Sequence, residues 1–306
     1  MARDFPDPSI TQDTDGTWYA FGTASGGKNI QAASAPAPDG PWTYIDQDIL
    51  PGGAGPWTAD GTNTWAPDVR VIAPGKYVMY YSGELGNDTA LHCIGVATSF
   101  TTFEVKGGIL GPYTPATEPF ACPTEHGGAI DPSGFLDAVT GRRYVVYKVD
   151  GNSIGHGGSC NNDVAPYVPT PILLQEVDAD DGVTKVGGEP VEILDRTEAD
   201  GPLVEAPDLM QVVVDGSSTF VLFYSSHCWV SDKYSVNYAT SAGNITGPYV
   251  RSGKPLVATG DFGTTSPGGA TSAVGEGQMV FHANCQQGRC LFVAGLEVDG
   301  SVVSVS

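Results

Sequence analysis

The sequence predicts an all-β protein, a five-bladed β-propeller with four antiparallel strands in each blade. Three observations predict this fold. Four kinds of strand-like segment recur five times in the same order, the period is roughly 60 residues, and the composition suits short strands joined by turns. The 306 residues include 41 Gly and 23 Pro, and only 16% are charged, which disfavours long surface helices. We expect residues 1–306 to form one domain.

Each repeat begins with a proline-containing stretch, followed by an alternating strand rich in aromatic and β-branched residues. The proline-containing stretches lie at 5–10, 65–69, 129–133, 204–208 and 266–270. The alternating strands lie at 18–21, 77–81, 144–147, 220–224 and 279–282. Because the proline-containing stretch comes first in each repeat, we expect it to be the innermost strand, beside the central axis.

Two further segments complete each repeat. The third segments lie at 30–34, 94–99, 172–176, 236–241 and 291–295, and the fourth at 42–45, 102–105, 191–194, 249–250 and 302–305. The alternative fold, a β-sandwich, does not repeat a four-strand unit five times in register. The longest connections, 51–64, 106–128 and 150–169, then gather on one face of the disc, where a functional site is expected.

Four of the five innermost segments carry an acidic residue at nearly the same place: Asp7, Asp68, Asp131 and Glu205. The fifth has Gly268 and Gly269 instead. Successive acids are 61, 63 and 74 residues apart, about one blade each, so they should converge on one axial pocket. The alternative reading of any single Asp-Pro is an acid that caps a turn. Like charges brought together with little solvent are unfavourable unless the acids exchange protons or bind cations.

The chemistry that such a pocket suits is glycoside hydrolysis, in which two carboxyl groups face each other across the sugar. One, protonated, donates to the leaving oxygen, and the other, ionised, activates water or attacks carbon. The sequence contains no Gly-x-Ser-x-Gly elbow, no glycine-rich phosphate loop and no His-Glu-x-x-His zinc helix.

Taken together, the motifs Phe5-Pro-Asp-Pro-Ser, Trp65-Ala-Pro-Asp, Ala129-Ile-Asp-Pro-Ser and Val204-Glu-Ala-Pro resemble glycoside hydrolase family 43 over essentially the whole chain. This family comprises five-bladed propellers that act on arabinan, arabinoxylan and related plant polysaccharides. The resemblance implies Asp7 as general base, Asp131 as the acid that modulates pKa, and Glu205 as general acid. It also implies inversion, with the two catalytic carboxyls about 6.5–9.5 Å apart. An anionic Asp131 would raise the pKa of Glu205 and keep it protonated.

The sequence departs from the family at Glu205-Ala-Pro, where many members have Glu-Gly-Pro, and the added methyl group bears on subsite shape. Asp68 has none of the three family roles, and we interpret it as either a sugar-contacting or a structural acid. The resemblance further suggests that His282 faces an axial Ca²⁺, often through water. The alternative is a core histidine whose hydrogen bonds are satisfied. No cofactor is expected for the chemistry itself.

Aromatic rings beside the pocket are the remaining candidates for sugar binding, because a sugar face stacks on a ring. We select Trp65, Trp57 and Trp229 by their positions at the inner strand or in long loops. Lys148, at the end of the 144–147 strand, is a further candidate at the pocket rim, or else a solvated lysine.

Charge restricts the partners. The chain has 14 Lys+Arg against 35 Asp+Glu, a formal net charge of −21, so it should repel the phosphate backbone of nucleic acid. No apolar run approaches the roughly 20 residues that span a bilayer. We expect a monomer that binds neither nucleic acid nor membrane and acts on a plant polysaccharide or oligosaccharide.

Six cysteines, an even number without a CxxC pair, and the glycosylation sequences at Asn87 and Asn244 indicate a secreted glycoprotein. The first residues show no signal-peptide pattern, and we expect a signal peptide to have been removed. Cys285 and Cys290 flank a short turn between two strand segments, so we predict a disulfide between them. For the others we predict Cys160 with Cys228 and Cys93 with Cys122.

The most favoured function is hydrolysis of α-L-arabinofuranosyl linkages in arabinan or arabinoxylan by an inverting, secreted glycosidase. A β-xylosidase or a galactan-cleaving enzyme of the same family is the alternative. A different class, a non-catalytic propeller that binds sugar or calcium, also retains such acids. Base, modulator and acid are all present, which favours the enzyme.

Overall fold

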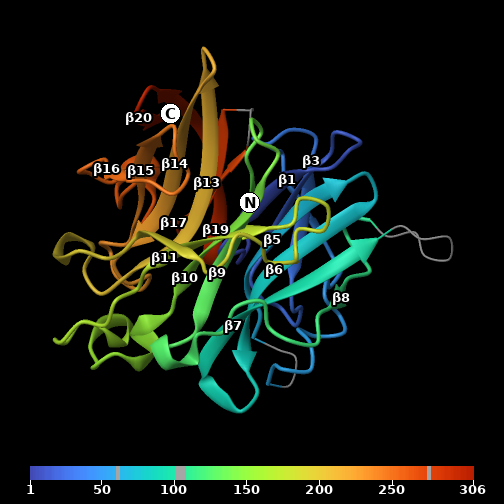
Figure 1. Ribbon diagram of the computed structural model, residues 1–306, viewed down its shortest axis with the longest axis horizontal. Helices are drawn as coiled ribbons and strands as arrows, with labels where there is room; N and C mark the ends of the chain where they lie inside the picture. The colour runs from blue at the N-terminus through green and yellow to red at the C-terminus, as the bar shows by residue number, and fades with distance from the viewer. Residues whose placement is uncertain (60–62, 101–107, 274–276) are drawn as a thin grey trace.

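The computed structural model describes residues 1–59, 63–100, 108–273 and 277–306. In these residues the strands form five antiparallel sheets of four strands, each built from strands consecutive in the sequence. The first strands of the five sheets also contact one another in a ring, with β1 beside both β5 and β17. Figure 1 shows them nearest the middle of the molecule. The predicted five-bladed propeller is confirmed.

The strands of each blade follow the order of the sequence segments. The first strands are β1 (Ser9–Gln12), β5 (Trp65–Ala73), β9 (Ala129–Leu136), β13 (Val204–Val214) and β17 (Gly268–Ala273). The second strands are β2 (Trp18–Gly22), β6 (Lys76–Leu85), β10 (Arg143–Val149), β14 (Ser217–Ser226) and β18 (Gln278–Cys285). The third strands are β3 (Gln31–Ala35), β7 (Asp88–Phe100), β11 (Ile172–Val177), β15 (Ser235–Ala242) and β19 (Gly288–Asp299).

The fourth strands, on the outside, are short. They are β4 (Thr43–Ile45), β8 (Thr114–Pro115), β12 (Val191–Leu194), β16 (Val250–Arg251) and β20 (Val302–Val305). The strand predicted at 102–105 lies outside the described residues, and β8 is the fourth strand of its sheet. Single 3₁₀ turns occupy the connections: η1 (Thr124–His126), η2 (Gly151–Ile154), η3 (Ser159–Asn161), η4 (Glu198–Asp200) and η5 (Asp261–Gly263). None of the helices in the described residues is long and apolar enough to cross a membrane.

The core lies between neighbouring blades rather than inside one sheet. Along β14, Phe220 and Leu222 pack against blade 3, whereas Val221 and Phe223 pack against blade 5. Successive side chains of a strand point to opposite faces, so a strand buried on both faces needs a continuous apolar run. This explains why the second segment of each repeat is so hydrophobic.

Two connections join the ends of the chain into the ring. Phe5 N–H donates to Arg289 O at 2.7 Å, and Thr271 Oγ1 donates to Pro8 O at 2.9 Å. Asp4 accepts hydrogen bonds from Arg289 N–H at 2.9 Å and from Ser25 Oγ at 2.8 Å. The first blade is therefore fastened to the last by residues that precede β1.

Candidate active site

An unusual backbone conformation recurs at the start of every blade. One residue beside or within the first strand has a positive φ in all five blades: Asp7 (51°), Ala66 (44°), Asp131 (57°), Ala206 (50°) and Gly269 (58°), of which the first four directly precede a proline. A non-glycine residue in this region costs on the order of 1–3 kcal/mol, so the surrounding structure must enforce it. In four blades the ladder between the first two strands also shifts register near this point. Such bulges re-aim side chains beside active sites.

The residues with positive φ show which positions of the blades are equivalent, and therefore how the four predicted acids align. Asp7 and Asp131 occupy equivalent positions, Glu205 lies one residue before its equivalent, Ala206, and Asp68 lies two residues after Ala66. A cavity of about 430 Å³ is lined by Asp7, Asp131 and Glu205. Asp68 is not among the residues that line it. Three of the four acids therefore meet in this cavity, and Asp68 lines a smaller axial pocket, of about 30 Å³, together with Asp7 and Asp131.

Asp7 is surrounded by groups that stabilise its ionised form. Arg289 donates to both carboxylate oxygens, at 3.0 and 3.4 Å, and Thr23 Oγ1 donates at 2.6 Å. His282 Nδ1 lies 3.3 Å from Oδ1. Burial alone would raise the pKa of Asp7, but the charge of Arg289 and the hydrogen bonds from Thr23 and Arg289 outweigh it and lower the pKa below its usual value. Asp7 is an ionised carboxylate at neutral pH.

Glu205 is held by two donors. Tyr234 OH donates to Oε1 at 2.8 Å, and the Lys148 ammonium lies 3.3 Å from Oε2. Lys148 is fully buried and also pairs with Asp150 at 3.0 Å. Burial opposes its charge, but Asp150, Glu205 and Asp131 raise the pKa of Lys148 above its usual value. The prediction of a solvated lysine was wrong, because three acids compensate the ammonium for the loss of water.

Asp131 and Glu205 interact as a pair. Burial, then the charge of Glu205, raises the pKa of Asp131 to about 8, although Lys148 opposes this. Asp131 Oδ2 accepts the Ala206 N–H at 2.9 Å. Because the two carboxyls lie close together in a buried cavity, one proton is shared by the pair. The sequence did not show that Lys148 lies against Glu205.

Asp68 lies on the axis beneath this cavity. It is 2% exposed, and its Oδ2 accepts hydrogen bonds from Arg70 Nε and Gly134 N–H, both at 2.7 Å. Arg70 also reaches Asp208 at 3.4 Å. Of the two roles predicted for Asp68, this position favours the structural one. The equivalent positions in the next two blades are Ser133 and Asp208, which bond to each other at 2.9 Å.

The selected tryptophans separate into two groups. Trp65 and Trp229 line the cavity, whereas Trp57 packs in the core against Tyr81, with ring centroids 6.4 Å apart. We predicted Trp57 as a sugar-binding residue because it precedes the second inner strand. Its side chain instead packs over Gly95 in the core. Trp65 stacks on His92 at 3.9 Å between ring centroids.

Trp229 is 47% exposed at the cavity wall, with the Arg289 guanidinium 5.1 Å from its ring centroid. Arg289, Tyr234, Thr23, His92 and Asp150 are cavity residues that the sequence did not reveal. A signal was available for Arg289 alone, because it lies in the turn between the two cysteines 285 and 290.

His282 is fully buried beside the axis and stacks on Tyr234, with ring centroids 5.9 Å apart. Its Nδ1 accepts the Asp7 N–H at 3.0 Å, so the neutral ring carries its proton on Nε2. Burial, then Arg289, lowers the pKa of His282 to about 3. Nε2 is buried and has no partner among the described residues. A protonated nitrogen does not ligate a cation directly, so this ring does not fit direct coordination of Ca²⁺.

The other described side chains do not form a direct metal site either. No group of three His, Cys, Asp or Glu side chains with the geometry of a metal site occurs in the parts of the chain that the structure describes. A Ca²⁺ ion prefers six to eight oxygen ligands. The predicted axial ion, if held near His282, would therefore depend on water for its ligands.

The three predicted disulfides are confirmed: Cys93–Cys122, Cys160–Cys228 and Cys285–Cys290. Two of these disulfides help to form the cavity wall. Cys160 lines it and joins the connection after β10 to the loop that carries Trp229. The Cys285–Cys290 bridge closes the β18–β19 hairpin, and Arg289, the second residue of β19, contacts Asp7.

Residues 3–297 match the model of the glycosyl hydrolases family 43. The fold and the acidic axial cavity therefore belong to a known class: the chain is a member of glycosyl hydrolase family 43. This confirms the resemblance drawn from the five repeats.

Relatives and solved structures agree with the family. The chain is 39% identical over 108 residues to a probable arabinan endo-1,5-alpha-L-arabinosidase A of Aspergillus flavus. It is 35% identical over 101 residues to arabinan endo-1,5-alpha-L-arabinosidase A of Aspergillus aculeatus. These matches cover 34% and 33% of this chain, and only 32% and 29% of the relatives' length.

Two solved structures share the fold over nearly the whole chain. A thermostable family-43 glycoside hydrolase superposes with a TM-score of 0.77 at 20% identity, covering 98% of this chain and 92% of that one. The alpha-L-arabinanase of Cellvibrio cellulosa complexed with arabinohexaose gives 0.67 at 19%, covering 100% and 96%.

Proposed function

We propose that this protein is an extracellular, inverting glycosidase that cleaves α-L-arabinofuranosyl linkages in arabinan or arabinoxylan. The single observation that carries the proposal is the arrangement of three carboxyls in one cavity. One is held ionised by Arg289, and the other two compete for a proton. Inverting hydrolysis requires such a division between base and acid. Membership of family 43 and the partial likeness to fungal arabinanases support the choice of substrate.

Asp7 is the proposed general base. Its lowered pKa keeps it ionised across neutral pH, and Arg289 and Thr23 fix the orientation of both oxygens. An ionised, immobile carboxylate can accept the proton of a water molecule as that water attacks the anomeric carbon. The base needs no cofactor.

Glu205 is the proposed general acid, and Asp131 modulates its pKa. Because the two carboxyls are coupled, a proton belongs to the pair rather than to one residue. When a leaving oxygen displaces water beside Glu205, the carboxylate loses solvation, and transfer of the shared proton to Glu205 becomes favourable. Asp131 then remains anionic and Lys148 balances its charge. Trp65 and Trp229 supply apolar ring surface to the sugar.

Replacing Glu205 by Gln tests this assignment. The variant should lose at least about 10²-fold in kcat on arabinan, whose leaving group needs a proton, and much less on an activated aryl arabinofuranoside. Rates on both substrates, measured with purified protein of unchanged melting temperature, give the comparison. Equal, small losses on the two substrates would refute the role of Glu205.

Proton NMR of the first product formed by the wild-type protein tests the base independently. If Asp7 activates water, the first anomer has the inverted configuration, whereas a retained one would exclude Asp7 as base. A product profile on arabinan, arabinoxylan, xylan and galactan separates the arabinosidase from a xylosidase or a galactan-cleaving enzyme. Binding without turnover on all of them would instead favour a sugar-binding propeller.

Three disulfides support the proposed extracellular location, because such bonds persist in oxidising compartments. Asn87 and Asn244, the predicted glycosylation sites, are both exposed in turns. Their side chains are therefore accessible to modification.

A further inference from the structure

Two buried charges in the axial cavity belong to neither the proposed base nor the proposed acid. Lys148, near the end of β10, and Asp150, in the connection that follows it, both line this cavity. Lys148 is 0% exposed and Asp150 is 5% exposed. Replacing a buried ion pair by apolar side chains of similar volume often leaves a fold as stable or makes it more stable. Stability alone therefore does not account for these two charges.

The Lys148 ammonium bridges two carboxylates. It lies 3.0 Å from Asp150 Oδ1 and 3.3 Å from Glu205 Oε2. The other oxygen of Glu205, Oε1, accepts a hydrogen bond from Tyr234 OH at 2.8 Å. Both oxygens of Glu205 are thus held, and one of the two groups that hold them is itself held by Asp150.

Strand β10 fixes the positions of both charges. Lys148 pairs with Ile172 on one side and with Ile130 on the other, so its backbone lies in the interior of the sheet. Asp150 follows the strand directly. Residues two apart in an extended chain point to the same side, which brings the two side chains together. Asp150 is therefore in a position to compete with Glu205 for the same ammonium.

Other ionisable groups surround the ammonium and its two carboxylates. Those whose charges interact with them are His92 beside Asp150 and Lys148, Asp7 beside Asp131, and Arg289 and Tyr234 beside Glu205. Burial and the charge of Glu205 raise the pKa of Asp131, whereas Lys148 lowers it. The ammonium thus favours loss of the proton that the Asp131–Glu205 pair shares.

We propose that Lys148, anchored by Asp150, is a positioning residue that fixes the Glu205 carboxyl and sets the pH at which the Asp131–Glu205 pair loses its shared proton. This inference rests on the proposed function, in which that proton goes to the leaving oxygen. The ammonium stabilises the fully ionised pair, and Asp150 weakens this effect because it draws on the same charge. The balance between Lys148 and Asp150 therefore determines the alkaline limit of hydrolysis.

Two variants should move the alkaline limb of kcat/KM in opposite directions. The substrate is linear α-1,5-linked arabinohexaose, whose leaving group needs a proton. Lys148→Met removes the cation, so the pair keeps its proton to higher pH, and the limb should rise by about one to three pH units. Asp150→Asn leaves the ammonium uncompensated, so the pair loses its proton earlier and the limb should move to lower pH. A merely structural role would lower the rates and leave both limbs in place.

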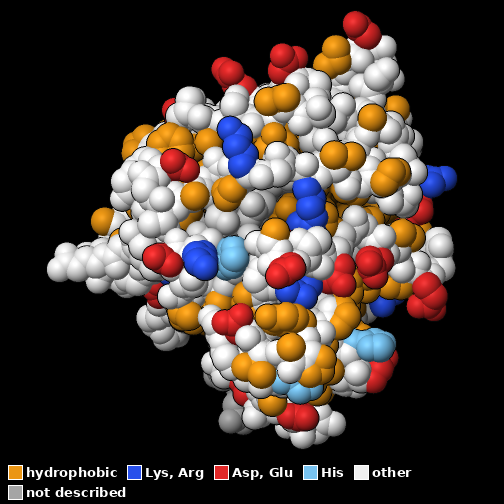
Figure 2. Space-filling model, turned by 90° about the vertical axis from the view of Figure 1, so that its left-hand side faces the viewer, with side chains coloured by type: hydrophobic (Ala, Val, Ile, Leu, Met, Phe, Trp, Pro, Cys, Tyr) orange, Lys and Arg blue, Asp and Glu red, His pale blue; other side chains and the backbone are white. Residues whose placement is uncertain are grey.

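A change in net charge alone is tested by Lys254→Met. Lys254 is exposed, and this substitution removes one positive charge, as Lys148→Met does. On the side of the molecule shown in Figure 2, basic side chains lie among acidic ones rather than in one patch. Solvent and salt screen such exposed charges, so Lys254→Met should keep the wild-type limb.

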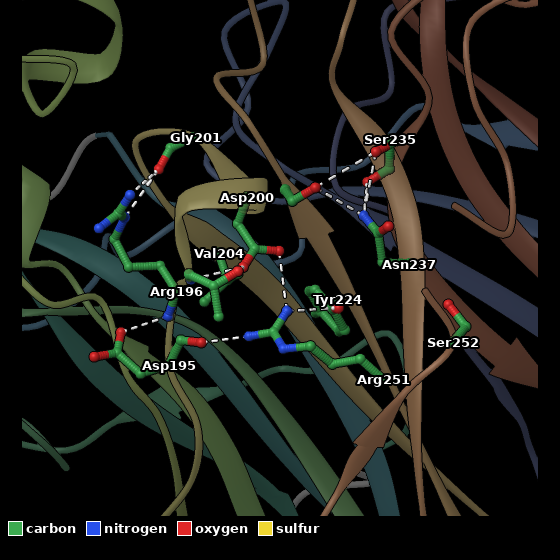
Figure 3. Close-up of polar contacts among 12 residues, drawn as sticks. Asp195, Arg196, Asp200, Gly201, Val204, Tyr224, Ser235, Asn237, Arg251 and Ser252 are labelled. Carbon is green, nitrogen blue, oxygen red and sulfur yellow. Dashed lines mark hydrogen bonds and ion pairs between the residues drawn. The ribbon is translucent and has the colours of Figure 1, made fainter. Parts of the chain in front are cut away.

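Arg251→Met is the matched control, because Arg251 also pairs with a buried acid. It donates to Asp200 Oδ1 at 3.0 Å and to Tyr224 OH at 2.8 Å, as Figure 3 shows. This ion pair borders a second cavity, of about 360 Å³, between blades 3 and 4. The loop between β14 and β15 has a cavity on each side, since Trp229 lines the axial one and Lys233 the second. Arg251→Met should therefore leave the alkaline limb in place.

Opposite shifts in Lys148→Met and Asp150→Asn, with no shift in either control, support the inference. Limbs that stay in place, or that move in the same direction, refute it and leave the proposed function standing. Carboxyl ¹³C NMR of the ligand-free protein follows the proton of the pair without turnover, so the wild type and Asp150→Asn suffice if Lys148→Met does not fold. An unchanged titration in Asp150→Asn would overturn the inference. If the wild-type protein hydrolyses no glycoside, the proposed function fails, and this titration still decides whether the two charges control the pair.

Discussion

The carboxylate of Asp7 lies between a guanidinium, an imidazole and a hydroxyl group. Arg289 and Thr23 reverse the rise in pKa that burial alone would cause. The lowered pKa of His282 leaves its ring neutral, so it adds no positive charge beside the carboxylate. The ionised state of Asp7 therefore depends mainly on Arg289.

Arg289→Gln should shift the pH dependence of hydrolysis. A base with a lowered pKa stays active as pH falls until it takes up a proton. Without Arg289, burial dominates, the pKa of Asp7 rises, and the acidic limb of kcat/KM should move to higher pH. The position of the limb is the measurement, and Arg142→Gln, at an exposed arginine, is the control. An acidic limb that stays in place would show that Arg289 does not set this pKa.

At the scale of elements, the first strand of each blade has a left-handed residue at or near its start, and in four blades a bulge accompanies it. This conformation points Asp7 and Asp131 into the cavity and shifts Glu205 by one position. In the fifth blade the equivalent residue is Gly269. A Cβ at this position would lie 2.8 Å from the ring of His282, so glycine leaves room for the imidazole. The fifth blade lacks an acid here because an imidazole occupies the space.

The two disulfides beside the cavity should differ in their effect on stability. Cys160–Cys228 closes a loop of 68 residues and Cys285–Cys290 one of 5. In the chain-entropy model, removing the first should lower the free energy of unfolding by about 4 kcal/mol and the second by about 2 kcal/mol. Denaturant unfolding of the two double Cys→Ser variants measures both values. A larger loss from the hairpin bridge than from the long one would contradict this expectation.

At the scale of the whole molecule, a buried polar network at the axis joins four blades. Arg70 of blade 2 contacts Asp68, Ser133 of blade 3 and Asp208 of blade 4. Asp208 in turn accepts hydrogen bonds from the N–H and hydroxyl of Ser272, in blade 5. These contacts hold the inner strands in a ring whose walls form the cavity above.

Arg70→Met should destabilise the whole propeller. It leaves Asp68 and Asp208 buried without a cation, which typically costs about 3–5 kcal/mol at neutral pH. Burial already raises the pKa of Asp208, and loss of Arg70 would raise it further. The folded state would then bind protons more readily than the unfolded state, so the loss should shrink as pH falls. Urea unfolding at neutral and acidic pH measures this, and a loss that grows on acidification would contradict it.

Much of this architecture could be predicted from the sequence, because repeats and alternation are local patterns. The five repeats gave the blade order, and the acids of three motifs do meet in one cavity. The fourth strand of blade 2 was predicted at 102–105, which lies outside the described residues, whereas the structure has Thr114–Pro115 (β8) as the fourth strand of that sheet.

The parts of the site that sequence analysis missed share one property, which is that they depend on distances between blades. Lys148 was predicted either at the pocket rim or as a solvated lysine, and it lines the cavity, but nothing near it in the sequence shows that Glu205, 57 residues away, lies 3.3 Å from its ammonium. Trp57 and Asp68 seemed to be cavity residues for the same reason, although one packs in the core and the other pairs with Arg70.

The sequence by itself determined the number of blades, the family, the Cys285–Cys290 disulfide and the three acids that meet in the cavity. These follow from spacing along the chain, which the propeller preserves as one blade per repeat. The tertiary structure decided that the pKa of Asp7 is lowered and that of Asp131 raised, because pKa values depend on burial and on charges brought close by other blades. It also decided that a single loop has a cavity on each side, which no linear pattern records.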